Sequence, residues 1–360
     1  MTDNGSKKAH RRYSSNGSSN VGSSIEIEGT ETSVFWKFVD WIVTLDTSSP
    51  TTENYSTIPQ ISNYVFFLGG RLRTVSGTKA LSVVVFAIIV VPMVLFSIFE
   101  VHKVWTFGHG HGALIVLFYY TWAICFASLL KCATSDPGVL PRNVHVPLAH
   151  NDFEIPQEYY NIITLPGTAH NKRPVEVKYC TTCRIWRPPR ASHCSTCEAC
   201  IITHDHHCVW INNCVGQRNY RYFLTFLSSG VISSVLCIAV CALHLSRVSR
   251  TRDAVPAVFL IVYCVLAVCY PLLLLIFHFF VTSTQQTTRE YLRNIRSRRE
   301  FLRGFKSPPT NSFDTASRTR NMYTLMCQRR GFSLVSARGK HVPGDWRFLK
   351  LPHPHNFEKV

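Results

Sequence analysis

Seven of the fourteen cysteines of this 360-residue chain lie between Cys180 and Cys214, and six of them form a repeated spacing with two histidines. One quartet comprises Cys180, Cys183, His193 and Cys200; the same offsets, shifted by 14 residues, give Cys194, Cys197, His207 and Cys214. Three sulfurs and one imidazole form a ligand set of closed tetrahedral zinc sites. Because the quartets interleave, the spacing predicts two structural Zn²⁺ ions that brace one short stretch of chain.

One cysteine of this stretch, Cys208, is not needed as a metal ligand. It follows Asp205, His206 and His207 directly. A free thiol has a pKa of about 8.5 and becomes a nucleophile when a histidine or positive charge favours the thiolate. Since His207 is assigned to a metal, we expect His206 to act as the base and Asp205 to hold its other ring nitrogen. The closed metal sites have no open coordination position and are not expected to catalyse.

These assignments have structural alternatives. Cys208 could be a buried structural thiol, and His206 could support a metal site by hydrogen bonding. We expect Arg187 and Arg190 to add positive charge near the thiol, and His204 to face solvent.

The cysteines outside this stretch are expected to act as small apolar residues. Two of them, Cys132 near the end of an apolar block and Cys327 in the tail, are secondary candidates for acylation.

Four apolar blocks dominate the rest of the chain. They are Leu81–Phe99, Ala113–Leu130, Tyr222–Ser246 and Ala254–Thr288. Roughly 20 apolar residues suffice for a helix to span a bilayer. Buried core helices of a soluble protein are the alternative, but the chain has too little soluble sequence to cover four of them. We therefore predict an α-helical polytopic membrane protein, with four transmembrane helices and a two-zinc cytosolic domain between helices 2 and 3.

The predicted organisation follows from these blocks. We expect a disordered or amphipathic cytosolic tail at 1–60 and a juxtamembrane segment at 61–79. Transmembrane helices follow at 80–100, 112–132, 222–245 and 254–281, with a cytosolic loop at 133–221 that carries the zinc domain (178–223), and a basic cytosolic tail at 282–360. Val34–Leu45 is interpreted as an interfacial helix or a docking segment, and Thr287–Arg303 as a basic amphipathic helix. Met1–Ile25 is polar, so no signal peptide is expected there.

Charge and cysteine usage suggest the orientation. Lys and Arg are frequent in the loop between spans 2 and 3 and after span 4, whereas Val101–Gly112 contains only Lys103. The three arginines of Arg247–Asp253 argue weakly the other way. Positive-inside bias and metal-binding rather than disulfide-bonded cysteines place both termini and the zinc domain in the cytosol. The net charge of +17 suits anionic lipid or a phosphorylated cofactor. Nucleic acid is not expected for a protein with four spans.

These features favour thioester chemistry at the bilayer. A thiol forms thioesters readily, and a helix bundle offers an apolar slot for an acyl chain, worth about 0.8 kcal/mol per buried CH₂. Basic residues of the juxtamembrane helix can bind the phosphates of a cofactor. The residues therefore point to acyl transfer from a fatty acyl-CoA through a Cys208 thioester. The alternatives are a zinc-braced membrane scaffold and an acyl-thioesterase that uses the same thiol.

The run Cys180–Phe223 resembles the DHHC cysteine-rich domain of protein S-acyltransferases. The shared positions are the CxxC pairs, Arg187-Pro188-Pro189-Arg190, His193-Cys194, Cys200, Asp205-His206-His207-Cys208, Trp210, Asn213-Cys214-Val215-Gly216, Asn219 and Phe223. Asp136-Pro137-Gly138 resembles the DPG motif of this family, and Thr287-Thr288-Arg289-Glu290 resembles its TTxE motif. Asn321 and Tyr323 fit the family's C-terminal aromatic-and-Asn motif, although its usual Pro and Gly are missing nearby.

The resemblance implies ping-pong S-acylation of protein cysteines by palmitoyl-CoA. It implies that Cys208 is acylated, with His206 as base, Asp205 orienting it and His207 binding zinc. Thr288, Arg289, Arg293 and Arg296 are then candidates for supporting the active site and acyl-CoA.

The finer pattern is similar to the Erf-type catalytic subunits of fungal Ras palmitoyltransferases. Phe66–Arg73, Val175–Arg190 and Arg329–Gly339 carry this similarity. It implies a small accessory subunit, Ras-like GTPases as substrates, and the endoplasmic reticulum membrane, with the Golgi as the alternative.

Overall fold

The computed structural model describes residues 62–67, 72–76, 81–146, 155–167, 174–248, 250–302, 311–331 and 333–334. The predicted tail at 1–60, with the segment Val34–Leu45, lies outside the described residues, as does the chain after residue 334.

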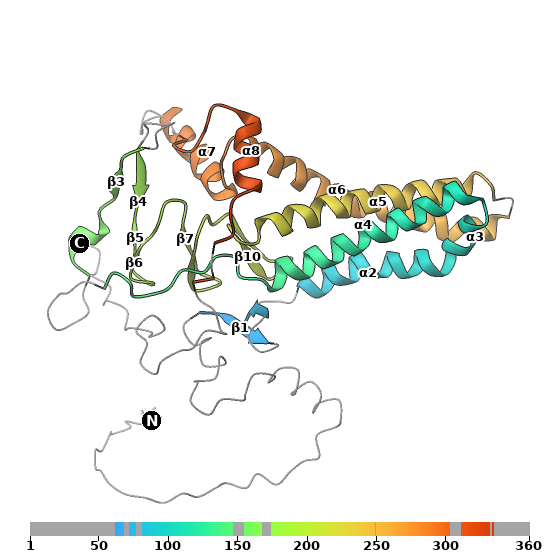
Figure 1. Cartoon of the computed structure of the whole chain (residues 1–360), viewed down its shortest axis with the longest axis horizontal. Helices are drawn as coiled ribbons and strands as arrows, with labels where there is room; N and C mark the ends of the chain where they lie inside the picture. The colour runs from blue at the N-terminus through green and yellow to red at the C-terminus, as the bar shows by residue number, and fades with distance from the viewer. Residues whose placement is uncertain are drawn as a thin grey trace, which may run out of the picture. The chain divides into compact units, whose positions relative to one another are not determined.

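Four helices are long and apolar enough to cross a membrane. They are α2 (Leu81–Phe99), α4 (His109–Thr134), α5 (Tyr220–Leu245) and α6 (Thr251–Ser283). Helix α5 packs against α4 and α6, α2 packs against α6, and the short helix α3 (Val101–Trp105) connects α2 to α4 (Figure 1). Many large apolar side chains point outward, among them Leu266 and Leu273, as expected of helices that face lipid. The predicted four-helix membrane architecture is confirmed.

A buried polar pair lies at the end of this bundle remote from the cysteine-rich sequence. His244 Nδ1 is 2.6 Å from Glu100 Oε2, and both side chains are almost completely buried. The ring of Phe107 lies 6.4 Å from that of His244. A buried carboxylate needs such a partner, so this pair joins the end of α2 to the end of α5.

The residues between α4 and α5 form a cysteine-rich domain (residues 174–219) built from short hairpins. Its hairpins are β5–β6 (Tyr179–Cys180 and Ile185–Trp186), β7–β8 (Ser192–Cys194 and Ala199–Ile201) and β9–β10 (His206–Cys208 and Asn213–Val215). Each hairpin is antiparallel and forms a two-stranded sheet of its own, and Ile201 of β8 also forms an isolated bridge with Val139. A further hairpin joins β3 (Ile163–Leu165) to β4 (Val175–Val177) after the 3₁₀ turn at Gln157–Tyr160. Sheets this small need other cross-links to be stable.

The chain before the first membrane helix folds back onto this domain. Strands β1 (Tyr64–Phe67) and β2 (Leu72–Val75) form a hairpin. The Asn212 side-chain amide donates to Val75 O at 2.8 Å, and the Tyr64 hydroxyl lies 3.2 Å from Asn213 Oδ1. The β1–β2 hairpin therefore packs directly against β9–β10.

The exit from α4 is a tight turn at Asp136-Pro137-Gly138. Asp136 Oδ1 accepts hydrogen bonds from the amides of Gly138 and Val139, both at 2.9 Å. Gly138 has φ +114°, and a Cβ there would lie 2.5 Å from Ile202 Cγ2. Only glycine fits this conformation and this close approach. Asp136 also forms ion pairs with Arg73 at 3.5 Å and Arg218 at 3.3 Å, so the turn ties α4 to both the β1–β2 hairpin and the start of α5.

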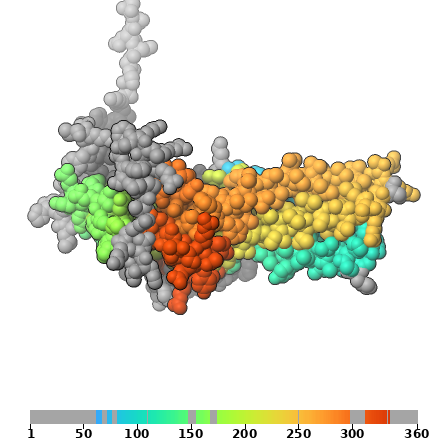
Figure 2. Space-filling model, turned by 90° about the horizontal axis from the view of Figure 1, so that it is seen from above, coloured from blue at the N-terminus to red at the C-terminus, as the bar shows by residue number. Residues whose placement is uncertain are grey.

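After α6 the chain returns to the cysteine-rich domain. Helix α7 (Thr288–Leu302) is followed by α8 (Arg318–Met326), which packs against α6. Figure 2 shows this part of the tail, in red, against the orange segments of α6 and α7. Asn321, only 2% exposed, donates to Ser283 O at 2.9 Å. The tail therefore docks on the end of α6 through Asn321, without the missing Pro and Gly of the motif.

Candidate active site and metal centres

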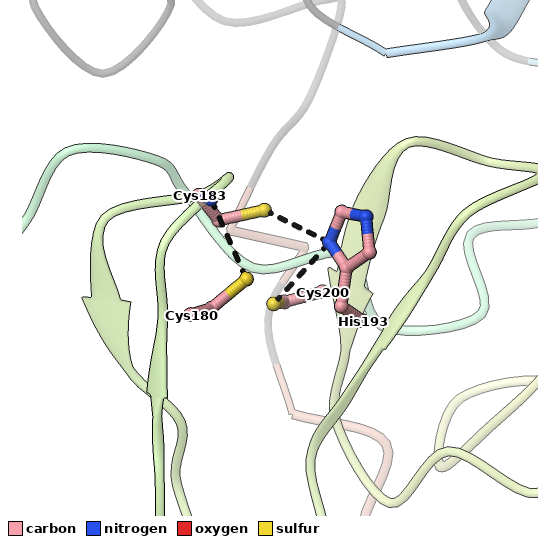
Figure 3. Close-up of side chains that lie close together, drawn as sticks. All are labelled: Cys180, Cys183, His193 and Cys200. Carbon is pink, nitrogen blue, oxygen red and sulfur yellow. Dashed lines mark hydrogen bonds between the residues drawn. The ribbon is translucent and has the colours of Figure 1, made fainter. Parts of the chain in front are cut away.

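The first predicted quartet converges in space. Figure 3 shows Cys180 and Cys183, from the β5–β6 hairpin, facing His193 and Cys200 from β7–β8. The Sγ atoms of Cys183 and Cys200 lie 3.4 and 3.9 Å from His193 Nδ1. Ligands at about 2.0–2.3 Å from a tetrahedral ion are about 3.3–3.8 Å apart. The spacing of these atoms therefore fits one metal ion.

The second quartet has the same geometry. His207 Nδ1 lies 3.8, 3.4 and 3.6 Å from the sulfurs of Cys194, Cys197 and Cys214, and the last two sulfurs are 3.4 Å apart. All four ligand atoms lie within 4.8 Å of one another. The three hairpins of the domain are thus joined through two clusters that could each hold a metal.

Strand geometry explains the interleaving of the clusters. His193 and Cys194 are neighbours on β7, and neighbouring side chains on a strand point to opposite faces. One therefore belongs to the first cluster and the other to the second. The same alternation on β9 directs His207 to the second cluster and Cys208 away from it.

The sulfurs of a cluster shift one another's pKa. Hydrogen bonds from Cys197 and Cys214 lower the pKa of Cys194, whereas hydrogen bonds from Cys194 and Cys197 raise the pKa of Cys214. Three adjacent sulfurs cannot all ionise without a counter-charge. A divalent cation supplies that charge, so the donor set fits a metal chemically as well as geometrically.

Cys208 lies beside a bonded Asp–His pair. Asp205 Oδ2 is 2.7 Å from His206 Nδ1, and His206 and Cys208, two residues apart on β9, point to the same face of the strand. Burial alone would lower the pKa of His206, but its interactions with Asp205 and Cys208 raise that pKa to about 10. Burial alone would raise the pKa of Asp205, but the bond to His206, its positive charge and the Thr288 amide lower it to about 2. The pair thus favours an ionised Asp205 and a proton-accepting His206.

The thiol is enclosed by the ends of the membrane helices. Cys208 is 6% exposed and belongs to an apolar cluster with Leu129 of α4, Phe223 and Leu227 of α5, and Leu275 of α6. At the tip of its hairpin, the Trp210 ring lies 6.1 Å from that of Tyr270 on α6. The sulfur therefore lies where the cysteine-rich domain meets the bundle.

Helix α7 begins at the Asp205 carboxylate. Thr287 and Glu290 form a capping box: the Glu290 amide donates to Thr287 Oγ1 at 3.2 Å, and the Thr287 amide donates to Glu290 Oε2 at 2.8 Å. The Thr288 amide, in the first turn, donates to Asp205 Oδ1 at 2.7 Å. A helix N-terminus stabilises a negative charge. The TTxE sequence therefore starts a helix whose Thr288 amide holds Asp205.

An ion pair docks this helix on the cysteine-rich domain. Arg190 donates to the two Glu290 carboxylate oxygens at 3.0 and 2.8 Å and stacks over the Phe313 ring at 4.7 Å. Arg187 donates to Lys178 O. Arg187 thus faces Lys178 O, and the charge of Arg190 is paired with that of Glu290; that the two arginines add positive charge near the thiol stays a prediction.

Three residues that the sequence pattern did not indicate, Tyr220, His278 and Thr282, close the membrane side of the site. The Tyr220 hydroxyl lies 3.0 Å from His278 Nδ1 and 3.2 Å from Thr282 Oγ1, and all three side chains are buried. A nitrogen of His278 lies within 4.8 Å of ligand atoms of Asp205 and His206. A lone histidine in an apolar block gave no signal of this placement.

Two other expectations about single residues need correction. His204 does not face solvent: it is 4% exposed, and its Nε2 lies 3.5 Å from Cys214 Sγ. Cys132 is completely buried against Asn219 O, which argues against its acylation, whereas Cys327 is exposed. Arg289, Arg293 and Arg296 are exposed on α7.

Comparison with known proteins agrees with this site. A family model described as DHHC palmitoyltransferase matches residues 174–295. The chain is 48% identical over 360 residues to Palmitoyltransferase ERF2 of Eremothecium gossypii, covering 98% of this chain and 97% of that protein. It is 48% identical to the protein of the same name from Saccharomyces cerevisiae, over 92% of this chain and 93% of that one.

The chain belongs to the DHHC palmitoyltransferase family. It is therefore an acyltransferase enzyme of the membrane. In this palmitoyltransferase the family match covers the cysteine-rich domain, α5, α6 and the first half of α7. These are the elements that contribute Cys208, His278 and Thr288 to the site.

Proposed function

We propose that this palmitoyltransferase works by a ping-pong mechanism in which Cys208 carries the acyl group as a thioester. The observation that supports this most strongly is the position of the Cys208 thiol. It lies between a bonded Asp205–His206 pair and an apolar cluster formed by three membrane helices. Such a site offers a base on one side and space for apolar substrate on the other.

The first half-reaction acylates Cys208. Because Nδ1 of His206 is bonded to Asp205, Nε2 is the nitrogen that takes the thiol proton. The thiolate attacks the carbonyl carbon of palmitoyl-CoA, the bond from that carbon to the CoA sulfur breaks, and His206 returns the proton to CoA. In the second half-reaction a substrate cysteine gives its proton to His206 and attacks the Cys208 thioester, which restores the Cys208 thiol.

Palmitoyl-CoA suits the surroundings of the thiol. Each CH₂ of the palmitoyl chain that is buried among residues such as Leu129 and Leu275 contributes about 0.8 kcal/mol to the free energy of binding. The exposed Arg289, Arg293 and Arg296 of α7 are suited to the phosphates of CoA. Thr288 acts in this proposal through its amide, which holds Asp205.

The metal of both clusters is proposed to be zinc. Cys₃His sets at these spacings are typical of structural zinc. The metals would fix the three hairpins relative to one another, and thereby hold Asp205, His206 and Cys208 in place.

Ras-like GTPases are the proposed protein substrates, and a small accessory subunit is the proposed partner. Similarity to Erf-type subunits across nearly the whole chain, well beyond the cysteine-rich domain, supports both proposals. The endoplasmic reticulum membrane is the proposed location, with the Golgi as the alternative. Basic loops support cytosolic termini and a cytosolic zinc domain.

The experiment that tests this function is acyl-enzyme formation on purified protein. Wild type and Cys208→Ser are incubated with labelled palmitoyl-CoA and then treated with neutral hydroxylamine. We expect label on the wild type only, released by hydroxylamine, with the metal content of both proteins equal. Equal label on both proteins, or none, would remove Cys208 from the mechanism and favour the zinc-braced scaffold. Transfer to water rather than to a substrate protein would identify a thioesterase.

A further inference from the structure

The three hairpins of the cysteine-rich domain share one register. In each of them a cysteine pairs with the residue five positions later. The pairs are Cys180 with Ile185, Cys194 with Ala199, and Cys208 with Asn213. The hairpin that carries Cys208 is therefore a third copy of the unit that supplies a CxxC pair to each metal cluster.

The turns of the three hairpins also agree. In each turn the residue four positions after the cysteine has a left-handed backbone, with φ of 51°, 49° and 50°. These residues are Arg184, Glu198 and Asn212. A left-handed non-glycine residue is uncommon, so the match in all three turns indicates one shared turn geometry.

The hairpins differ at the position three residues after the cysteine. In the first two, this position holds Cys183 and Cys197, which are completely buried metal-ligand candidates. In the third it holds Ile211, which is 1% exposed. Ile211 thus occupies the place of a second sulfur.

We propose that Ile211 keeps Cys208 available for acylation, because it replaces the second ligand of what would otherwise be a third metal-binding pair. This inference rests on the proposed role of Cys208 as the acylated thiol. The hairpin that carries Cys208 is then a metal-binding hairpin that lacks its second cysteine ligand.

The backbone of the first two hairpins shows what a thiol at position 211 would do. The amides of Cys183 and Cys197 donate to the first sulfur of their own pair at 3.4 and 3.5 Å, and both sulfurs of each pair belong to one cluster. The same backbone would bring a sulfur at position 211 beside Cys208.

Further donor atoms are already at hand near Cys208. Asp205, His206 and His278 offer ligand atoms within 4.8 Å of one another, and His206 lies on the same face of β9 as Cys208, two residues before it. Two thiols with an imidazole are a favourable set for Zn²⁺, which would displace the thiol protons to solvent. A metal-bound sulfur would no longer be free to attack a thioester.

Isoleucine has a second effect at this position. Its side chain lies in the same apolar cluster as Cys208, Leu129 and Leu275. The position that would hold a polar metal ligand is thereby part of the apolar surface next to the reacting sulfur.

The test compares Ile211→Cys with Ile211→Ser in the full-length protein. Both substitutions leave cavities of similar size, and the new side chains differ in one atom, which is sulfur in cysteine and oxygen in serine. An effect of poorer packing is therefore common to both variants. Both proteins are kept under a thiol-free reductant, dialysed against Zn²⁺, and assayed for zinc per chain and for labelling by palmitoyl-CoA. The same labelling in native membranes, without purification, covers the case in which both variants are too unstable to purify.

We expect Ile211→Ser to hold the zinc content of the wild type, and its labelling rate, which includes the loss of the apolar side chain, is the reference for Ile211→Cys. Ile211→Cys should gain about one zinc per chain and lose labelling at least tenfold relative to Ile211→Ser. Adding Cys208→Ser to Ile211→Cys should remove the extra zinc. The inference is overturned if Ile211→Cys gains no zinc and labels as fast as Ile211→Ser. If wild type itself is not labelled at Cys208, the proposed function fails. The zinc content of Ile211→Cys still decides whether this hairpin binds a metal once its second cysteine is supplied.

Discussion

Removing the Glu290 carboxylate should release the start of α7 from the active site. Arg190 donates to both oxygens of Glu290, and the Thr287 amide donates to one of them. The ion-paired side chains are only 9% and 15% exposed, so solvent screens their interaction little. The same helix start places the Thr288 amide 2.7 Å from Asp205 Oδ1. Glu290→Ala should therefore affect Asp205 indirectly, by moving the Thr288 amide that donates to it.

The expected magnitude follows from these contacts. Leaving one partner of a buried ion pair alone costs about 3–5 kcal/mol, and the residual exposure of Arg190 and Glu290 argues for the lower end. Loss of the capping box adds about 1 kcal/mol. Once the helix start is released, Asp205 loses a charge-assisted hydrogen bond worth about 1.5–3 kcal/mol. At 1.36 kcal/mol per factor of ten, acyl-enzyme formation should slow about 10- to 100-fold.

The assay is the single-turnover rate of Cys208 labelling by palmitoyl-CoA, measured with metal content and thermal stability. Glu290→Gln, which keeps the shape and one acceptor oxygen, should fall between wild type and Glu290→Ala. The matched control is Glu176→Ala. Glu176 lies 4.0 Å from Lys178, and these side chains are 55% and 45% exposed. An exposed pair of this kind contributes about 0–1 kcal/mol, so the control should label at the wild-type rate.

Two results would refute this reasoning. Labelling of Glu290→Ala within twofold of wild type would show that Asp205 does not depend on the start of α7. Loss of both metals in Glu290→Ala would show that the ion pair supports the fold of the cysteine-rich domain rather than the position of Asp205.

Three further predictions concern the metal clusters, the domain junction and the membrane side of the site. Cys183→Ser should lose about one zinc per chain, as counted by elemental analysis; an unchanged count would make the ligand assignment wrong. Gly216→Ala should destabilise the protein by more than about 2 kcal/mol, because its Cβ would lie 2.7 Å from Pro137 O, whereas Gly110→Ala, with nothing within 4 Å, should not. Thermal unfolding of the two variants decides this. His278→Phe keeps a ring but removes the nitrogens beside the Asp–His pair, and should slow Cys208 labelling about tenfold. His278→Gln keeps polar atoms and should slow labelling less. Equal labelling rates for the two variants would contradict a polar role for this residue.

Local sequence determined much of the chemistry. Cys180 and Cys183, or Cys194 and Cys197, are three residues apart, and a tight hairpin brings such residues together wherever it lies in the fold. The membrane helices were equally readable, since α2 and its three counterparts are defined by length and apolar composition. Asp205 and His206 are adjacent, so their pairing too needed no distant partner. In each case the interacting groups are close along the chain.

Tertiary structure decided what approaches these groups from elsewhere. Arg190 and Glu290 are 100 residues apart, and Thr288 and Asp205 are 83 apart. No local pattern shows that Arg190 faces Glu290 instead of the thiol, because charge alone does not name a partner. His278 likewise looks like any polar residue in an apolar helix until α5 and α6 pack together.

The sequence by itself therefore determined the candidate metal-ligand sets, the proposed nucleophile and the number of candidate membrane helices, since each depends on spacing or composition within one segment. Only the tertiary structure decided which distant groups hold Asp205 and His206, that His204 is buried, and that Ile211 packs in one apolar cluster with Leu129 and Leu275. The physical reason is that these features arise when separate segments dock, and docking depends on the packing and hydrogen bonds of whole elements rather than on their order along the chain.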